Sequence, residues 1–195
     1  MRVIGITGPT GCGKTTLLRV IERHGGYVVD CDALYYEMLR ENAPMRAALT
    51  DAFGDIFLPD GTLDRPKLGA LVFSDPAALE RLNGIVYRYM NEEMRALLAA
   101  EAAKDRPYFA IDAINLTQSG LAALCDATVA VLAPRAQRLA RIMARDGIPE
   151  DYARRRIDAQ EPDGFYRDSC DVTLENSGTR EAFQQICEQW LQAIK

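Results

Sequence analysis

The sequence predicts an α/β protein built on a parallel β-sheet, and three observations support this fold class. Residues 3–7 form a short β-branched run that ends in a glycine-rich turn and leads into a helical pattern. A second apolar run at residues 27–30 completes a strand–helix–strand unit, which joins parallel strands. Apolar residues recur at helical spacing over residues 183–194 and predict a helix packed against the sheet.

Five segments have the character of buried strands, because apolar, β-branched or aromatic residues run together between turn signals. We therefore expect a sheet of five parallel strands. The predicted strands are residues 3–7, 27–30, 108–112, 127–132 and 171–174.

The stretch between the second and third predicted strands is mostly helical in pattern. Helix starts are indicated at Pro44, Pro66 and Pro76, each of which follows an Asn or Asp within two residues. A helical block of this length between two strands predicts an inserted subdomain, which we assign to residues 33–105.

A second helical region follows the fourth strand and is rich in arginine. It opens at Pro134 and is interrupted near Gly147, and its spacings place Arg138, Arg141 and Arg145 on one helix face. A solvated charged face is the usual explanation of such a run. The alternative, which we prefer, is a lid over residues 135–160 whose arginines close on a transferring phosphate.

Composition indicates an ordinary globular protein. The 195 residues are 48% hydrophobic and 26% charged, with a formal net charge of −5. An acidic balance argues against a nucleic acid or an anionic membrane as partner.

No apolar stretch approaches the ~20 residues of a transmembrane helix, and the turn at Gly8 comes too early for a signal peptide. We therefore expect a cytoplasmic protein.

The glycine-rich turn matches the phosphate-binding pattern G-x-x-x-x-G-K-[ST] in full. Its glycines let successive backbone N–H groups face one concavity, and the following helix directs its positive end to the same point. We expect Lys14 to reach the β- and γ-phosphates of a nucleoside triphosphate and the Thr15 hydroxyl to be a ligand of Mg²⁺. The predicted nucleotide-binding residues of this segment are Gly8, Pro9, Thr10, Gly11, Cys12, Gly13, Lys14, Thr15 and Thr16.

The thiol of Cys12 lies within this predicted phosphate loop. A position at a helix N-terminus lowers thiol pKa values and would make Cys12 redox-sensitive. The simpler interpretation, which we prefer, is a small residue that fills a tight turn. The five cysteines form no CxxC pair, so neither a disulfide framework nor a zinc site is indicated.

Carboxylates follow two of the predicted strands, at the edge of a parallel sheet where ligands bind. Asp30 and Asp32 come after the second strand, and they share one side of the chain if that segment stays extended. We expect one of these carboxylates to accept a substrate proton and another to help hold Mg²⁺ or its waters, and we assign the metal to Asp112, after the third strand. The alternative is that one of the first pair is only the N-cap of the helix that follows.

With these pieces in place, the chain resembles the dephospho-CoA kinase family over almost its whole length. No later segment is as specific as the phosphate loop, but their order and spacing together are specific. The segments that carry the resemblance are residues 8–15, 29–32, 53–54, 60–68, 72–76, 79–83, 141–148, 156–160 and 171–178.

The resemblance implies a P-loop kinase fold of three layers, an inserted helical substrate domain and a helical lid. It implies ATP and Mg²⁺ as cofactors, dephospho-CoA as substrate, and transfer of the γ-phosphate to the ribose 3′-hydroxyl. It also implies that Asp32 is the general base, that Arg141 and Arg145 face the phosphates, and that Asn176 lies near the adenine. The expected parts are a nucleotide-binding core (1–32, 106–134 and 161–195), the substrate subdomain (33–105) and the lid (135–160). We expect a monomer or a weak homo-oligomer.

The sequence departs from the family pattern on the acceptor side. Tyr36 replaces a common arginine, Tyr87-Arg88 replaces a usual His-Pro, and the segment after Asp112 differs from the typical Asp-x-Pro-Leu-Leu-Phe-Glu. Two alternatives to dephospho-CoA kinase activity therefore stay open at this point: a P-loop kinase for another small alcohol or nucleotide, and a nucleotide-binding regulator without transfer activity.

Overall fold

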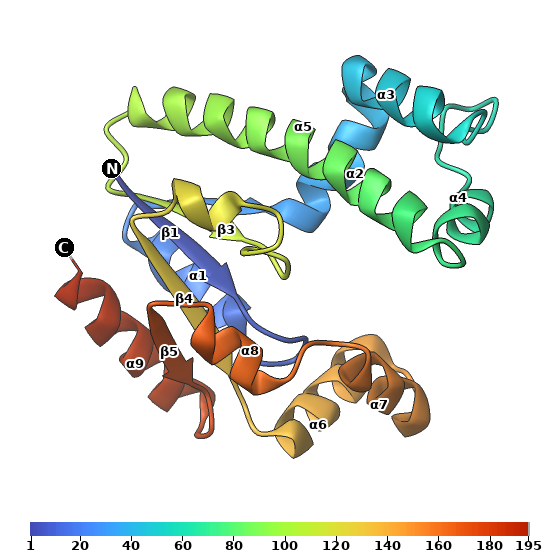
Figure 1. Ribbon diagram of the computed structural model, residues 1–195. Helices are drawn as coiled ribbons and strands as arrows, with labels where there is room; N and C mark the ends of the chain where they lie inside the picture. Colours follow the sequence, from blue (N-terminus) through green and yellow to red (C-terminus); the bar gives the residue numbers. More distant parts are fainter. Residues whose placement is uncertain (195) are drawn as a thin grey trace. The chain divides into compact units, whose positions relative to one another are not determined.

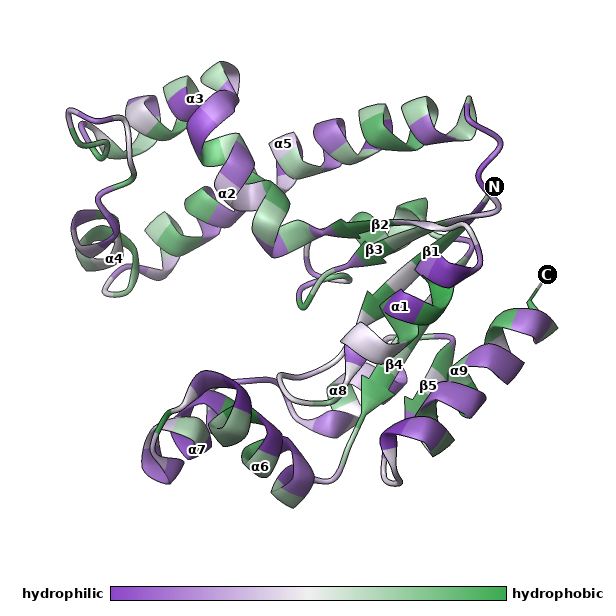
Figure 2. Ribbon diagram, turned by 180° about the vertical axis from the view of Figure 1, so that it is seen from behind, coloured by the Kyte–Doolittle hydropathy of each residue, from purple (hydrophilic) through white to green (hydrophobic). Residues whose placement is uncertain are grey.

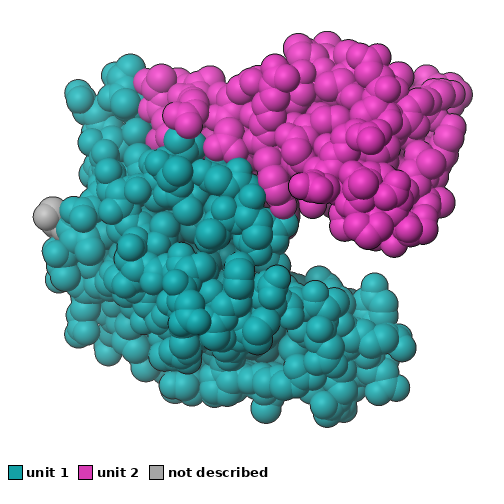
Figure 3. Space-filling view, in the orientation of Figure 1, with its two compact units in different colours: residues 1–29, 101–195 teal, residues 30–100 magenta. Residues whose placement is uncertain are grey.

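The computed structural model describes residues 1–194, and they form two compact units. The first unit contains residues 1–29 and the chain from Glu101 onward, and the second contains residues 30–100. Figure 3 colours the two units separately. Among residues 1–194, no helix has both the length and the apolar composition that a membrane span requires.

The first unit is built on one sheet of five strands, in the order β2-β3-β1-β4-β5. Strand β1 pairs in parallel with β3 and with β4, and β4 pairs in parallel with β5. The prediction of a five-stranded parallel sheet is confirmed, with the first strand in the centre. The strands are β1 (Arg2–Thr7), β2 (Tyr27–Asp30), β3 (Tyr108–Asp112), β4 (Ala127–Leu132) and β5 (Val172–Glu175).

Helices cover both faces of this sheet (Figures 1 and 2). Helices α1 (Lys14–Arg23) and α9 (Arg180–Ala193) pack on one face, where Ile4 and Ile6 of β1 join their apolar side chains. Gly5 faces the other way, and a Cβ there would lie 2.7 Å from Leu116. That face also carries the short 3₁₀ helix η1 (Leu121–Leu124).

A short helix on the sheet was not expected from the sequence. Helix α8 (Asp163–Asp168) packs against β4 through Tyr166, which is 2% exposed and contacts Ala130 and Leu132. Six residues are too few to show a helical period, and Gly164 lowers their helix propensity.

The arginine-rich region folds as two helices, α6 (Arg135–Asp146) and α7 (Glu150–Asp158). Gly147 ends α6 in the left-handed conformation, with φ of 64°, so the chain can reverse. The two helices pack through a small apolar cluster of their own, made by Ile142, Ala153 and Ile157. Figure 2 shows much of α6 and α7 in the purple of hydrophilic residues.

The second unit consists of four helices within residues 30–102. Asp30, Asn42 and Asp64 cap successive helices through their side chains. Buried residues from each helix, including Met45, Leu49 and Met94, give the unit a core of its own. The helices are α2 (Cys31–Glu41), α3 (Ala43–Phe53), α4 (Arg65–Val72) and α5 (Pro76–Ala102), of which the last runs back into the first unit.

Candidate active site

The loop between β1 and α1 has the backbone of a phosphate cradle. Gly8, Gly11 and Gly13 have φ values of 140°, 77° and 103°, a region that side chains disfavour. A Cβ on Gly8 would lie 2.2 Å from the carbonyl oxygen of Val131, and one on Gly13 would lie 2.3 Å from Nδ2 of Asn176. Only glycine therefore fits these two positions. No protein acceptor within residues 1–194 is recorded for the N–H groups of Gly11 and Gly13, which leaves them for an anion.

Lys14 lies over this loop, at the first residue of α1. Its Nζ donates to the carbonyl oxygen of Gly8 at 3.0 Å and lies 3.9 Å from Oδ1 of Asp112. The register of the sheet pairs Ile6 of β1 with Asp112 of β3, so the ends of the two strands are neighbours. The structure thus brings together two residues that lie 98 positions apart and that were both predicted to serve the phosphates or their metal.

The predicted metal ligand Thr15 follows Lys14 in the first turn of α1 and is exposed. Residues 1–194 contain no group of three or more His, Cys, Asp or Glu side chains that could hold a metal by themselves. A hydroxyl beside one carboxylate and a phosphate site suits Mg²⁺, which usually keeps several waters and shares its coordination with substrate phosphates.

Two side chains from distant segments fasten the far side of the loop. Asn176, which is 5% exposed, donates from Nδ2 to the carbonyl oxygen of Cys12 at 2.8 Å. Arg141 donates to the carbonyl oxygens of Gly11 and Cys12 at 3.3 Å each and to Oδ1 of Asn176 at 3.3 Å. Arg141 and Asn176, which were both expected to serve the nucleotide from outside the loop, therefore contact the loop backbone itself.

Arg145 has a different environment from Arg141. Its guanidinium donates to Asp146 at 2.6 Å and 3.0 Å, and its side chain is 58% exposed. The hydrogen bond from Arg145, helped by one from Arg156, lowers the pKa of Asp146 to about 2. Arg145 thus makes no contact with the phosphate loop in the described structure, and its expected role at the phosphates stays a prediction.

Two residues that contact the loop were not assigned to the site from the sequence. Arg138 is 4% exposed and donates to the carbonyl oxygen of Thr10, while Gln160 accepts from the N–H of the same residue. The available signal for Arg138 was its position on the same helix face as Arg141. For Gln160, whose segment was noted only for its resemblance, periodicity offered no signal because it lies after α7.

The two aspartates after β2 have different surroundings from those expected. The segment does not stay extended, because α2 begins at Cys31 and places Asp32 in its first turn. Oδ1 of Asp30 accepts from the N–H groups of Asp32 and Ala33 at 2.9 Å and 3.1 Å, so Asp30 is the N-cap. Both residues belong to the second unit, whereas Asp32 was expected to end the first segment of the core. The Asp32 side chain is exposed and is not used as the cap.

The lowered thiol pKa on which a redox-sensitive Cys12 depends does not agree with its surroundings. The side chain is 1% exposed, and this burial raises the pKa of the thiol even though Lys14 acts in the opposite direction. The preferred interpretation, a small side chain that fills a tight turn, agrees with this geometry. The apolar cluster under α1 and β1 includes Cys12.

Alkylation of the native protein tests this assignment. We expect the Cys12 thiol to react with iodoacetamide at least about a hundredfold more slowly than a free cysteine, because both burial and the raised pKa suppress the thiolate. The unfolded chain in denaturant serves as the control, with reaction at Cys12 followed by peptide mass spectrometry. Native labelling at the rate of the unfolded chain would contradict the burial of Cys12.

On the acceptor side, the second unit places a cation on Tyr36. The Arg65 guanidinium lies over the Tyr36 ring, 4.7 Å from its centroid, a distance at which cation–π attraction operates. Tyr36 itself is 43% exposed. A guanidinium is thus present beside the position where the family pattern has an arginine.

In the first unit, the divergent segment after Asp112 lines a cavity of about 290 Å³. Its polar wall contains the side chains of Asn115, Gln118, Gln160 and Glu161. Gln160 connects this cavity to the phosphate loop through its hydrogen bond to Thr10.

Comparison with known proteins gives a consistent result. Residues 2–181 match the family model described as dephospho-CoA kinase. A curated relative from Thermobifida fusca, named dephospho-CoA kinase, is 35% identical over 97% of this chain and 95% of its own length. Another of the same name from Anaeromyxobacter dehalogenans is 40% identical over 93% of this chain and 87% of its own length.

Solved structures agree with this comparison. The protein TT1252 from Thermus thermophilus has a TM-score of 0.77 and 32% identity, over 100% of this chain and 98% of its own. A structure named dephospho-CoA kinase from Campylobacter jejuni has a TM-score of 0.70, over 100% of this chain and 98% of its own. At 22% identity, that second likeness concerns the fold alone.

Proposed function

The chain belongs to the dephospho-CoA kinase family, and we propose that it transfers the γ-phosphate of ATP to the 3′-hydroxyl of dephospho-CoA, giving coenzyme A and ADP. The observation that carries this conclusion is the complete phosphate loop, with Lys14 between Gly8 and Asp112, in a chain that matches the family over residues 2–181.

Phosphoryl transfer asks for position and charge more than for covalent chemistry. In the step, the 3′-oxygen forms a bond to the γ-phosphorus while the bond from that phosphorus to the β–γ bridging oxygen breaks. Negative charge gathers on the leaving oxygen and on the equatorial oxygens. The ammonium of Lys14 and the N–H groups of Gly11 and Gly13 are preorganised to stabilise it, because the surrounding contacts already fix the loop.

The proton of the 3′-hydroxyl needs an acceptor, and we assign it to Asp32. Support comes from its exposed carboxylate, which is not consumed by helix capping because Asp30 has that task. Arg141, which already contacts the loop, is assigned to the phosphates. Arg145 would join it after exchanging Asp146 for a phosphate, and Asn176 holds the loop that receives the nucleotide.

Mg²⁺ fits this site, and when bound it neutralises charge on the β- and γ-phosphates. The Thr15 hydroxyl would be a direct ligand, and the Asp112 carboxylate would hold the ion or one of its waters. Asp112 meanwhile keeps Lys14 oriented across the loop.

Among the alternatives left open by the sequence, a kinase for an acceptor of another class is not favoured. Tyr36 replaces a common arginine of the family, but the Arg65 guanidinium lies over its ring and supplies a cation there for an anionic acceptor. The exposed Asp32 carboxylate, which is not used for helix capping, argues against a regulator that has lost transfer. We further propose that the protein acts in the cytoplasm as a monomer or a weak homo-oligomer, without a nucleic-acid partner, in keeping with its net charge of −5.

A coupled assay for ADP tests the proposal. The purified protein with dephospho-CoA and Mg-ATP is expected to release ADP and to form coenzyme A in equal amounts, with the product identified by mass spectrometry. Adenosine and pantetheine, the two ends of the acceptor without the diphosphate that joins them, serve as controls and are expected to give much slower release. The absence of turnover with dephospho-CoA would overturn the proposal, and faster turnover with another alcohol would replace the acceptor.

A further inference from the structure

The peptide groups at Thr10 are clamped from both sides by residues outside the phosphate loop. The N–H of Thr10 donates to Oε1 of Gln160 at 3.0 Å, and the carbonyl oxygen of Thr10 accepts from Nε of Arg138 at 3.1 Å. Arg138 also donates to Oε1 of Gln160 at 3.3 Å. Thr10, Arg138 and Gln160 thus form a closed ring of three hydrogen bonds, which we call the Thr10 clamp.

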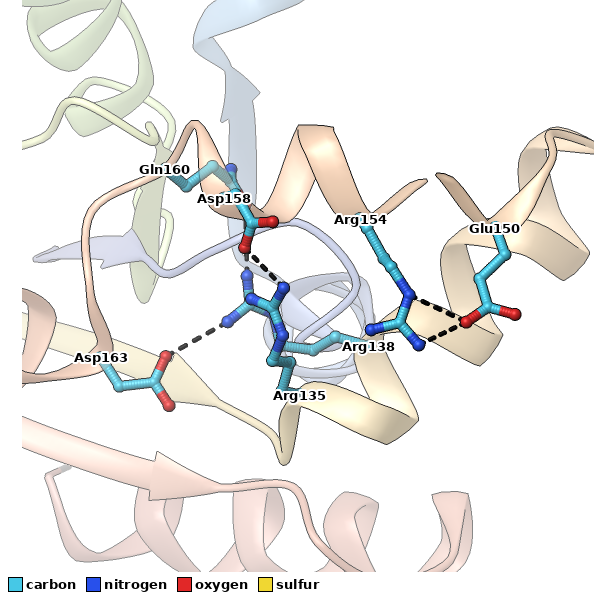
Figure 4. A network of polar contacts seen from close by, with 7 residues as sticks. All are labelled: Arg135, Arg138, Glu150, Arg154, Asp158, Gln160 and Asp163. Carbon is cyan, nitrogen blue, oxygen red and sulfur yellow. Dashed lines mark hydrogen bonds and ion pairs between the residues drawn. The ribbon is translucent and has the colours of Figure 1, made fainter. Parts of the chain in front are cut away.

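The charge of Arg138 is buried, and its environment explains how that is tolerated. Its side chain is 5% exposed and pairs with Oδ1 of Asp163 at 3.2 Å. A buried guanidinium is costly unless every donor has a partner. Figure 4 shows Arg138 reaching from α6 toward Gln160 and toward Asp163 at the start of α8. Burying a guanidinium costs free energy, and this guanidinium contacts the loop at Thr10. We infer that Arg138 positions the loop and is not part of a solvent-exposed charged face.

The clamp also joins both ends of the arginine-rich segment to the loop. Arg138 lies in the first turn of α6, and Gln160 follows α7. A separate ion pair between Arg135 and Asp158 links the same two helices without contacting the loop. Arg154, also in α7, pairs with Glu150 one turn earlier in the same helix. The same region therefore contains arginines that touch the loop and arginines that do not.

The orientation of Thr10 affects the rest of the loop, because the next residue is Gly11. With φ of 77° and no side chain, Gly11 leaves the loop free to turn at this point. Gly11 also packs directly on α6, since a Cβ there would lie 2.8 Å from the carbonyl oxygen of Arg138. Fixing the Thr10 carbonyl therefore fixes the direction of the Gly11 N–H, because the two groups belong to one planar peptide.

We propose that Arg138 and Gln160 are positioning residues for ATP binding: they hold Thr10 so that the next N–H groups of the loop face the phosphates, and they anchor the base of the α6–α7 hairpin there. The clamp leaves the transferring group untouched. It consequently acts on the affinity for ATP and on its KM, while kcat and the KM for the acceptor change little. This proposal rests on the nucleotide-binding role of the proposed function and concerns the same site.

Calorimetry with ATP alone, without acceptor, tests the clamp. Gln160→Met keeps the size of the side chain and removes its acceptor oxygen, and we expect it to raise the Kd for ATP about tenfold, the effect of losing roughly one hydrogen bond. Arg138→Met should raise it at least as much. Because both side chains act on one residue, the double variant should cost far less than the product of the two single effects.

Arg154→Met and Arg135→Met are the matched controls, since each removes an arginine from the same hairpin without touching the loop. Both should bind ATP within about twofold of wild type. Thermal unfolding without ATP checks that each variant folds. If Arg138→Met does not fold, the ATP affinity of Gln160→Met alone tests the clamp. Wild-type ATP affinity in Gln160→Met, or an equal loss in Arg135→Met, would overturn the clamp.

The wild-type protein separates this proposal from the proposed function. If wild type binds ATP but does not phosphorylate dephospho-CoA, only the proposed acceptor fails, whereas a wild type that binds no ATP overturns both.

Discussion

Replacing Lys14 with alanine is expected to lower kcat by about a thousandfold or more, because the variant loses the cation that meets the charge developing on the transferred phosphate. The geometry supports a large effect, since Nζ lies 3.0 Å from the Gly8 carbonyl oxygen and 3.9 Å from Asp112, in a half-buried position where water screens charge poorly. The measurement is steady-state kcat and KM with Mg-ATP and dephospho-CoA.

Lys104→Ala is the control for the loss of a lysine in the same unit. Lys104 pairs with Glu101 near the end of α5, and its side chain is 58% exposed, so the variant should keep nearly full activity. A Lys14→Ala protein that folds and retains more than a tenth of the wild-type kcat would contradict the role assigned to Lys14.

The second large effect is expected at Asp32. Asp32→Asn removes the proposed proton acceptor while keeping the size of the side chain, and we expect kcat to fall about 10²- to 10⁴-fold. The Kd for ATP should stay within about twofold, because Asp32 is not part of the phosphate loop. Asp32→Asn should therefore change kcat in steady-state kinetics and leave the Kd for ATP in calorimetry nearly unchanged. The variants of the Thr10 clamp should do the reverse.

Asp30→Asn is the matched control, two residues away in the same segment. Oδ1 of Asp30 accepts from two N–H groups of α2, and Asn caps helices about as well as Asp. The control should keep the helix and most of the activity. A large loss in Asp30→Asn with little change in Asp32→Asn would exchange the roles of the two aspartates.

These two aspartates illustrate where inference from the sequence stopped. Two carboxylates after an apolar run indicated the binding edge of a parallel sheet, but their roles depended on whether the chain stayed extended. The helix begins at Cys31, and its free N–H groups use Asp30, which leaves Asp32 exposed. A change of backbone conformation over two residues decided this, and no periodicity reveals it.

The strands were predictable for a physical reason. Residues 108–112 and 127–132 coincide with β3 and β4, because strands covered by helices on both faces appear as continuous apolar runs. Helix α8 was missed because it spans only six residues and acts through a single buried side chain, Tyr166. Short elements of that kind are specified by tertiary packing rather than by their own pattern.

Cys12 and Arg138 show the same limit in the site. From the sequence, a thiol at a helix N-terminus was compatible with a lowered pKa, and Arg138 was one arginine among seven in its region. In the structure, burial raises the pKa of the Cys12 thiol. Arg138 is buried as well, and its guanidinium donates hydrogen bonds to Thr10, Gln160 and Asp163. Burial is a property of the packed chain, so neither outcome could be read from local spacing.

The sequence by itself determined the parallel sheet, the phosphate loop and its lysine, because these depend on local patterns: apolar runs, glycines that permit positive φ, and a helix that starts at the loop. Only the tertiary structure decided which distant side chains hold that loop. Asn176, Arg141, Arg138 and Gln160 come from segments more than 120 residues away, and their contacts exist because β4, β5 and the helices between them return the chain to the end of β1.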